Sequence, residues 1–161
     1  MAHDLSRPMG ESDQLLCVRV GDQEFALSIR AIREIRGWIT STPLPHAPSY
    51  IKGMINLRGS VLAIIDLAER LGLPSVPPHG TSVVVVIEQG ERVVGLLVDA
   101  VSDIITATDE MRQVAPETGS VASREFVEGL LMRDKQIISV LSIEAVMPKD
   151  TSSIDAALAT A

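Results

Sequence analysis

The feature that most constrains the fold is an internal repeat of the apolar pattern. Residues 15–35 match residues 84–104 without a gap at a spacing of 69, and Gly21 in the first stretch falls on Gly90 in the second. A later part of the chain matches itself at a spacing of 76. Because turns, glycines and apolar runs recur in the same order, we interpret the chain as a duplication of one structural unit.

Each unit is expected to contain three strands, a loop, two further strands and a short helix. The apolar runs of the first unit are residues 15–20, 25–29, 32–35, 51–55 and 61–65. Asp66 and its counterpart Ser142 are the residue types that cap helix N-termini. Five short strands that must hide both edges and one apolar face commonly close into a small barrel. We predict a mainly β fold of two five-stranded barrels packed together, with short capping helices.

The last two runs of the first unit flank a turn, Asn56-Leu57-Arg58-Gly59-Ser60. Two aliphatic runs around an Asn/Gly turn are typical of a β-hairpin, and Gly59 can take the positive φ angle that such a turn requires. This places Arg58 at the tip, where we expect it to point away from the sheet. A long cation on a rigid turn is a good contact group, although a solvated arginine would look the same in sequence.

Composition narrows the classes of partner. Hydrophobic residues make up 46% of the chain but aromatic residues only 2%, so valine, isoleucine and leucine must build the core. The net charge is −7. An acidic chain with so few rings lacks the phosphate-neutralising and base-stacking groups of a nucleic-acid-binding barrel. The charge also disfavours an anionic membrane surface. We expect no nucleic-acid partner and no membrane insertion, and a small β-barrel nucleic-acid-binding module stays only a remote alternative.

The ends and the single cysteine bear on the location of the protein. Residues 1–13 are polar and we expect a flexible lead, whereas residues 150–161 are expected to be a flexible tail, leaving one domain over 14–149 with copies at about 14–73 and 81–148. No apolar run has the length of a membrane-spanning helix. Cys17 has no cysteine partner, which fits a reducing compartment. We expect a cytoplasmic protein.

No catalytic or metal-binding constellation is found in the sequence. His3, His46 and His79 have no second histidine or cysteine at a metal-ligand spacing, and no phosphate-binding glycine loop is present. Cys17 lies among apolar neighbours, as a core residue would. We predict no enzyme activity, no catalytic residue, no metal and no cofactor. A triad assembled from distant residues would have left no such motif, so a cryptic enzyme stays a remote alternative.

The two units agree in their core positions and differ at the tips of their last hairpins. The tip of the first unit is Asn56-Leu57-Arg58-Gly59 and that of the second is Met132-Arg133-Asp134-Lys135. Because the shared positions are scaffold, function is expected where the copies diverge. The duplication therefore indicates a binding module with at least one specialised turn.

These residues carry a resemblance to the CheW family of chemotaxis coupling proteins. The matching segments are EIRG (34–37), IKGMINLRG (51–59), IIDL (64–67) and VVGLLVD (93–99), within a resemblance over about residues 15–146. The resemblance implies two intertwined SH3-like barrels, which agrees with the duplication. It also implies a non-enzymatic adaptor that couples the cytoplasmic tips of chemoreceptors to the regulatory domain of a histidine kinase, recruited to receptor arrays as a monomer or weakly self-associating protein.

The resemblance also implies a receptor-binding groove between the barrels. By position it would include Ile32, Glu34, Gly53, Arg58, Gly59 and Gly95. Arg58 would be its chief polar anchor. For kinase binding the resemblance indicates only Glu117, within a loop whose spacing matches the family loosely. An adaptor of the same fold in another kinase pathway, such as surface motility or biofilm formation, fits the same residues.

Overall fold

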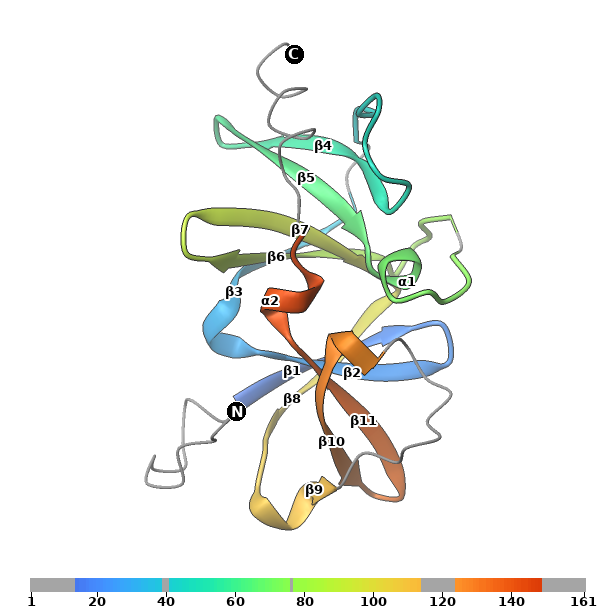
Figure 1. Cartoon of the computed structure of the whole chain (residues 1–161), viewed down its shortest axis with the longest axis vertical. Coiled ribbons are helices and arrows are strands. Elements are labelled where there is room, and N and C mark those ends of the chain that lie inside the picture. The colour runs from blue at the N-terminus through green and yellow to red at the C-terminus, as the bar shows by residue number, and fades with distance from the viewer. Residues whose placement is uncertain (1–13, 39–40, 76, 114–123, 149–161) are drawn as a thin grey trace.

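The computed structural model describes residues 14–38, 41–75, 77–113 and 124–148, and Figure 1 shows two curved β-sheets stacked along the long axis. Sheet A has the order β8 (Ala100–Thr106), β1 (Gln14–Val20), β2 (Gln23–Ser28), β11 (Gln136–Leu141), β10 (Val127–Arg133) and β9 (Arg112–Gln113). Sheet B has the order β3 (Ile32–Gly37), β6 (Val83–Gln89), β7 (Arg92–Val98), β5 (Ser60–Asp66) and β4 (Ile51–Leu57). The predicted mainly β fold is confirmed, and β9 adds a short sixth strand to sheet A.

Both sheets curl so that distant strands meet. In sheet B, β3 and β4 are the two edge strands, yet Glu34 on β3 contacts Arg58 at the end of β4. In sheet A, Asp103 on the edge strand β8 contacts Arg133 at the end of β10, with an Nη2–Oδ2 distance of 2.7 Å. Each sheet is therefore the wall of a small barrel, and we call these barrel A and barrel B.

Each barrel contains strands from both copies of the repeat. Strands β1 and β2 of the first unit join β8, β10 and β11 of the second in barrel A, whereas β6 and β7 of the second unit lie in the middle of barrel B (Figure 1). Four strand pairs join the units: β11 with β2 and β5 with β7 are parallel, whereas β1 with β8 and β3 with β6 are antiparallel. The two units are thus intertwined.

The hairpin turns repeat between the copies. Gly21 and Gly90 begin equivalent turns at φ angles of 62° and 61°. The turn after β4 has φ angles of 53° at Arg58 and 89° at Gly59, and the turn after β10 uses Asp134 and Lys135 at 50° and 68°. Positive φ at both central residues is the two-residue hairpin turn whose twist matches the strands. The predicted positive φ of Gly59 is confirmed, and Arg58 shares it.

Three apolar clusters fill the molecule. The largest lies between the sheets and includes Phe25 and Leu27 of β2 and Ile65 of β5. A second fills barrel A around Cys17, and a third fills barrel B around Ile64. Because both faces of the central strands are buried, β6 has an unbroken apolar run rather than an alternating one. This burial fixes the strands whose ends form the site described below.

Two short helices lie beside each other where the barrels meet (Figure 1). Asp66 caps α1 (Leu67–Arg70) through the Ala68 N–H, and Ser142 caps α2 (Ile143–Val146) through the Ala145 N–H. Three single-turn 3₁₀ helices complete the described elements: η2 (Ile29–Ala31), η3 (Asp109–Met111) and η4 (Arg124–Phe126). The capping roles expected of Asp66 and Ser142 are confirmed.

Arg70 joins the two units at this point. Its guanidinium donates to the carbonyls of Ala145, Val146 and Met147 at 3.0–3.1 Å, at the C-terminus of α2. The same group lies 4.5 Å from the centroid of the Tyr50 ring and 4.9 Å from that of Phe126. One cation thus satisfies carbonyls that a helix end leaves free and stacks on rings from both units.

Candidate functional site

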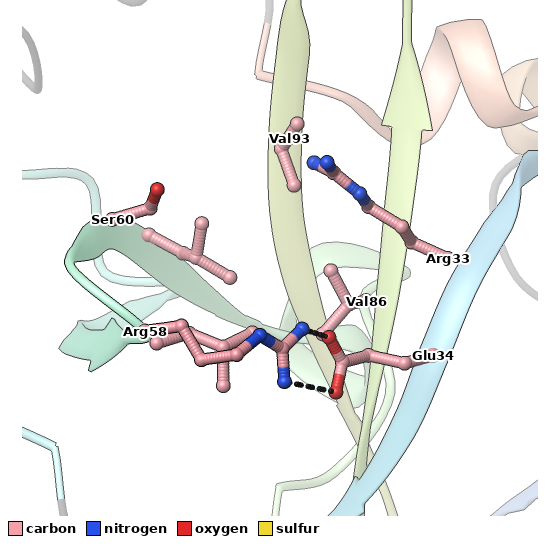
Figure 2. A pocket seen from close by; sticks show the side chains of 8 residues that line it. Arg33, Glu34, Arg58, Ser60, Val86 and Val93 are labelled. Atoms are coloured by element: carbon pink, nitrogen blue, oxygen red, sulfur yellow. Dashed lines mark hydrogen bonds and ion pairs between the residues drawn. The ribbon is translucent and has the colours of Figure 1, made fainter.

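A pocket of about 240 Å³ opens at one end of barrel B. It is lined by Arg33, Glu34, Leu57, Arg58, Ser60, Leu62, Val86 and Val93, the side chains drawn in Figure 2. The apolar members come from β4, β5, β6 and β7, and the charged members come from β3 and the β4–β5 turn. The site therefore has an apolar floor and a charged rim, which is the usual composition of a protein-docking pocket.

The rim is dominated by one ion pair. Figure 2 shows the Arg58 guanidinium facing the Glu34 carboxylate, with both pairs of atoms in contact; the longer contact, Nη1 to Oε1, is 3.4 Å. Arg36 adds a third guanidinium contact to the same Glu34 oxygen at 3.5 Å. Two-pronged arginine–carboxylate pairs hold their geometry well. Arg58 is nevertheless 67% exposed, so its other donors remain open to solvent.

The local sequence explains how Arg58 is held. The Asn56 side-chain oxygen accepts from the Gly59 N–H at 2.9 Å and closes the turn. Leu57 is buried on one side of the tip and anchors the end of β4 in the barrel. Our expectation that Arg58 points away from the sheet is wrong, because curling of the sheet brings β3 within its reach and the guanidinium folds back onto Glu34.

The pair shifts the titration of both members. Hydrogen bonding to Arg58, with added attraction from Arg58 and Arg36, lowers the pKa of the Glu34 carboxyl. The hydrogen bonds that Arg58 donates to the Glu34 carboxylate raise the pKa of Arg58. Both groups are therefore charged at neutral pH. The site offers a fixed charge pair and an apolar floor, which suits binding of a protein surface rather than proton transfer.

The remaining predicted site residues lie outside the pocket lining. Ile32 is half-buried against the core between the sheets, and Gly59 is exposed in the turn beside Arg58. Gly53 is buried in β4, and a Cβ there would lie 2.4 Å from the Thr42 carbonyl oxygen. Gly95 is buried in β7, where a Cβ would lie 2.6 Å from Val84 Cγ1. The structure therefore brings together Glu34 and Arg58, whereas Gly53 and Gly95 are accounted for by close packing.

Glu117, the residue considered for kinase contacts, lies outside the described residues. Among those that are described, no group of three or more histidine, cysteine or acidic side chains is placed to hold a metal ion. Nor does any helix of the described part have the length and apolarity needed to cross a bilayer.

Sequence reasoning put Glu34 and Arg58 in a groove but missed the other residues that line the pocket. Arg33 and the apolar lining come from five strands, and their meeting depends on pairings between segments far apart in the chain. One signal was available. Glu34 and Asp103 are separated by 69 residues, the spacing of the repeat, and both carry an arginine partner in the structure. An acid recurs at the same place in both copies because each copy uses it in the ion pair that closes its barrel.

Several known proteins are similar to this chain in sequence. A family model described as CheW-like domain matches residues 14–150. The chain is 49% identical over 139 residues to a probable chemotaxis protein CheW of Rhizobium etli, covering 86% of this chain and 90% of that protein. It is 47% identical over 137 residues to the chemotaxis protein CheW of Rhizobium meliloti, covering 85% and 88%.

A solved structure has the same fold. The scaffolding protein TtCheW of Thermoanaerobacter tengcongensis superposes with a TM-score of 0.78, covering 88% of this chain and 97% of that one. The sequence identity is 24%, so this likeness concerns the fold. The architecture of two intertwined barrels is therefore that of a known group of proteins.

Proposed function

The chain belongs to the CheW-like family, and from that membership we propose that it couples chemoreceptors to the regulatory domain of a histidine kinase. The family consists of non-enzymatic scaffold proteins, which agrees with the predicted lack of enzyme activity. The observation that carries the proposal is the family match over residues 14–150, joined to a rigid, exposed arginine at the rim of an apolar pocket.

The chemistry of the site supports a helical partner. The pocket floor is made of the apolar side chains Leu57, Leu62, Val86 and Val93, and Arg58 lies at its rim. An apolar centre surrounded by a charged rim is typical of a protein interface. The cytoplasmic tip of a chemoreceptor is a helical hairpin, and a helix offers an apolar stripe for these side chains and polar groups for Arg58. We place receptor binding here.

The same proposal covers the location of the protein, its oligomeric state and its binding of the kinase. The protein acts in the cytoplasm and is recruited to receptor arrays through its partners. It works as a monomer or a weakly self-associating protein, because its task is to bridge two other proteins. The kinase domain binds a surface other than the pocket, so loss of one partner leaves the other bound.

The test is co-sedimentation with a receptor signalling-tip fragment and the cognate kinase. Arg58→Glu reverses the charge at the rim and places two carboxylates together, so we expect receptor binding to weaken about tenfold or more while kinase binding is kept. The matched control is Lys135→Glu, which makes the same charge change at the equivalent hairpin tip of barrel A. We expect this control to bind the receptor as the unchanged protein does.

Three results would count against the proposal. If the unchanged protein sediments with neither partner, the coupling function is wrong. If Lys135→Glu loses the receptor as fully as Arg58→Glu does, the effect is one of net charge and the site is wrong. If circular dichroism shows Arg58→Glu to be unfolded, Arg58 is a structural residue.

A further inference from the structure

Each barrel is closed by an ion pair between an acid and an arginine. Glu34 pairs with Arg58 in barrel B, and Asp103, 69 residues later, pairs with Arg133 in barrel A. In each barrel the acid lies on an edge strand, and the arginine lies in the last hairpin's turn (Arg58) or directly before it (Arg133). As with Glu34, the hydrogen bond from arginine lowers the pKa of the Asp103 carboxyl. Both copies thus have an acid–arginine pair, although the arginines stand one position apart in the repeat because Arg133 falls on Leu57, and such a pair does not by itself make barrel B a docking site.

What distinguishes barrel B is a series of arginines that the second copy lacks. Three arginines recur at every third residue of the first unit: Arg30, Arg33 and Arg36. The corresponding positions 69 residues later hold Asp99, Ser102 and Ile105. Arginine was therefore introduced, or kept, in one copy only. Divergence of this kind is where a duplicated scaffold acquires a specific partner.

Two of these arginines are poorly compensated. Arg33 is 57% exposed and lies 3.9 Å from Glu88, which is 46% exposed, and an exposed pair at this separation contributes little. Arg30 is exposed in η2 and makes no ion pair with any residue in the described ranges. Arg33 also lines the pocket beside Glu34 and Arg58 (Figure 2). Its guanidinium is therefore available to a molecule bound there.

The surroundings of the pocket are positive on a negative protein. The charged groups of β3, η2, the β4–β5 turn and the neighbouring end of β6 are Arg30, Arg33, Arg36, Arg58, Glu34 and Glu88. Four arginines thus stand against two glutamates, while the whole chain carries −7. A negative protein repels an acidic partner at long range except where such a region faces it.

We propose that Arg30 and Arg33 are specificity-determining residues that attract acidic side chains on the helical partner bound at the barrel B pocket. This inference rests on the proposed function, since it assigns the partner to the receptor tip. Arg58 is already paired with Glu34, whereas the guanidinium groups of Arg30 and Arg33 can still pair with a carboxylate of the partner. Peripheral charges of this kind raise the rate of association more than they slow dissociation.

The experiment compares two doubly substituted proteins with the same net charge. Arg30→Gln with Arg33→Gln removes the proposed attraction, and Arg19→Gln with Lys135→Gln removes two exposed cations elsewhere. Association and dissociation rates with the receptor-tip fragment are measured at low and at high ionic strength. We expect the first variant to associate roughly tenfold more slowly at low salt, with dissociation nearly unchanged, and the difference to vanish at high salt. The control should match the unchanged protein.

The outcomes separate this inference from the function on which it rests. If the unchanged protein does not bind the fragment, the proposed function fails and this inference with it. If the unchanged protein binds and both variants behave alike, the function stands and the inference is wrong. If the unchanged protein instead binds a duplex DNA fragment with the stronger salt dependence, the arginines serve a nucleic acid and the inference is overturned.

Discussion

At the scale of single residues, two glycines at equivalent positions have different reasons to be there. Gly53 and Gly129 are separated by 76 residues, and each follows a register shift at the start of its hairpin. Gly53 has a φ angle of 152° and lies against the Thr42 backbone, because Thr42 pairs with Met54. Gly129 has open space where its Cβ would be. Only the first position excludes a side chain.

This difference predicts unequal effects of one substitution. Gly53→Ala forces a methyl group onto backbone atoms and a strained φ, so we expect a loss of about 2–4 kcal/mol in the free energy of unfolding. Gly129→Ala is its matched control and should change that free energy by less than about 1 kcal/mol. Urea titrations followed by circular dichroism measure both. Equal losses in the two variants would show that the Thr42 contact is unimportant.

Cys17 is a second residue whose surroundings decide its behaviour. It is fully buried in barrel A, and this burial, assisted by repulsion from Glu24, raises the pKa of the thiol from 9.0 to about 11. Between these values the unfolded chain loses the thiol proton while the folded chain keeps it. Unfolding is therefore favoured as the pH rises through this interval.

We expect this thiol to lower the free energy of unfolding by about 1.4 kcal/mol for each pH unit between pH 9.0 and about pH 11. In Cys17→Ala that contribution is absent, so its stability should fall less steeply over the same interval than that of the unchanged protein. Denaturant titrations at several alkaline pH values measure the two slopes. Parallel slopes would mean that the thiol ionises alike in both states.

At the scale of elements, α1 and α2 are too short to be stable alone and depend on each other. A one-turn helix does not repay the cost of its nucleation. Arg70 of α1 supplies donors to three carbonyls at the end of α2, and Tyr50 and Phe126 cover its guanidinium. The contact therefore joins the end of the first unit to the end of the second.

Replacing this arginine should destabilise the whole protein. Arg70→Met keeps an unbranched apolar stem but removes three hydrogen bonds and two ring contacts, so we expect a loss of about 2–4 kcal/mol in the free energy of unfolding. Arg92→Met is the control, because within the described residues Arg92 donates one hydrogen bond, to the Pro148 carbonyl at 2.8 Å. It should lose about 1 kcal/mol. Calorimetry that ranks the two variants the other way would refute the role of Arg70.

Local elements were predictable because their signals are local. The hairpin turns at Gly21 and Gly59 and the helix caps at Asp66 and Ser142 depend on residues within four positions of each other. The repeat then indicated two similar barrels. The conformation of Arg58 was harder to predict from the sequence, because arginine has no preference for positive φ. The geometry of the two-residue turn imposes that angle on it here.

The pairing of distant strands was not predictable in the same way. Apolar strands of similar length have no chemical mark that tells β2 to pair with β11 rather than with its own unit. The ion pair of Glu34 with Arg58 depends on the pairings of β3 with β6 and of β5 with β7 in sheet B, and the contact of Arg70 with α2 likewise joins the two units. The residues that act within one hairpin were therefore found from sequence, and the contacts across units were found only from the structure.

At the scale of the whole molecule, the intertwined strands make the two units one folding unit. Without the second unit, barrel B lacks β6 and β7, which separate β3 from β5. Without the first unit, barrel A lacks β1 and β2. Neither half can bury the core between the sheets, whose residues come from both.

We therefore expect fragments 1–79 and 80–161 to be unfolded when made separately and to fold when mixed. Circular dichroism of each fragment should show no cooperative thermal transition, whereas the mixture should show one. The control is the intact chain, which should unfold in a single transition. A cooperative transition in either fragment alone would contradict this account.

The parallel join between β2 and β11 also sets a delay during synthesis on the ribosome. The chain leaves the ribosome N-terminus first, and Phe25 of β2 must wait for Ser139 of β11 before its strand is paired on that side. About a hundred residues separate the two strands, so at 5–20 residues per second the wait is roughly 5–20 s. During that time the nascent chain presents an apolar hairpin with an open edge, a substrate for chaperones that the finished protein conceals.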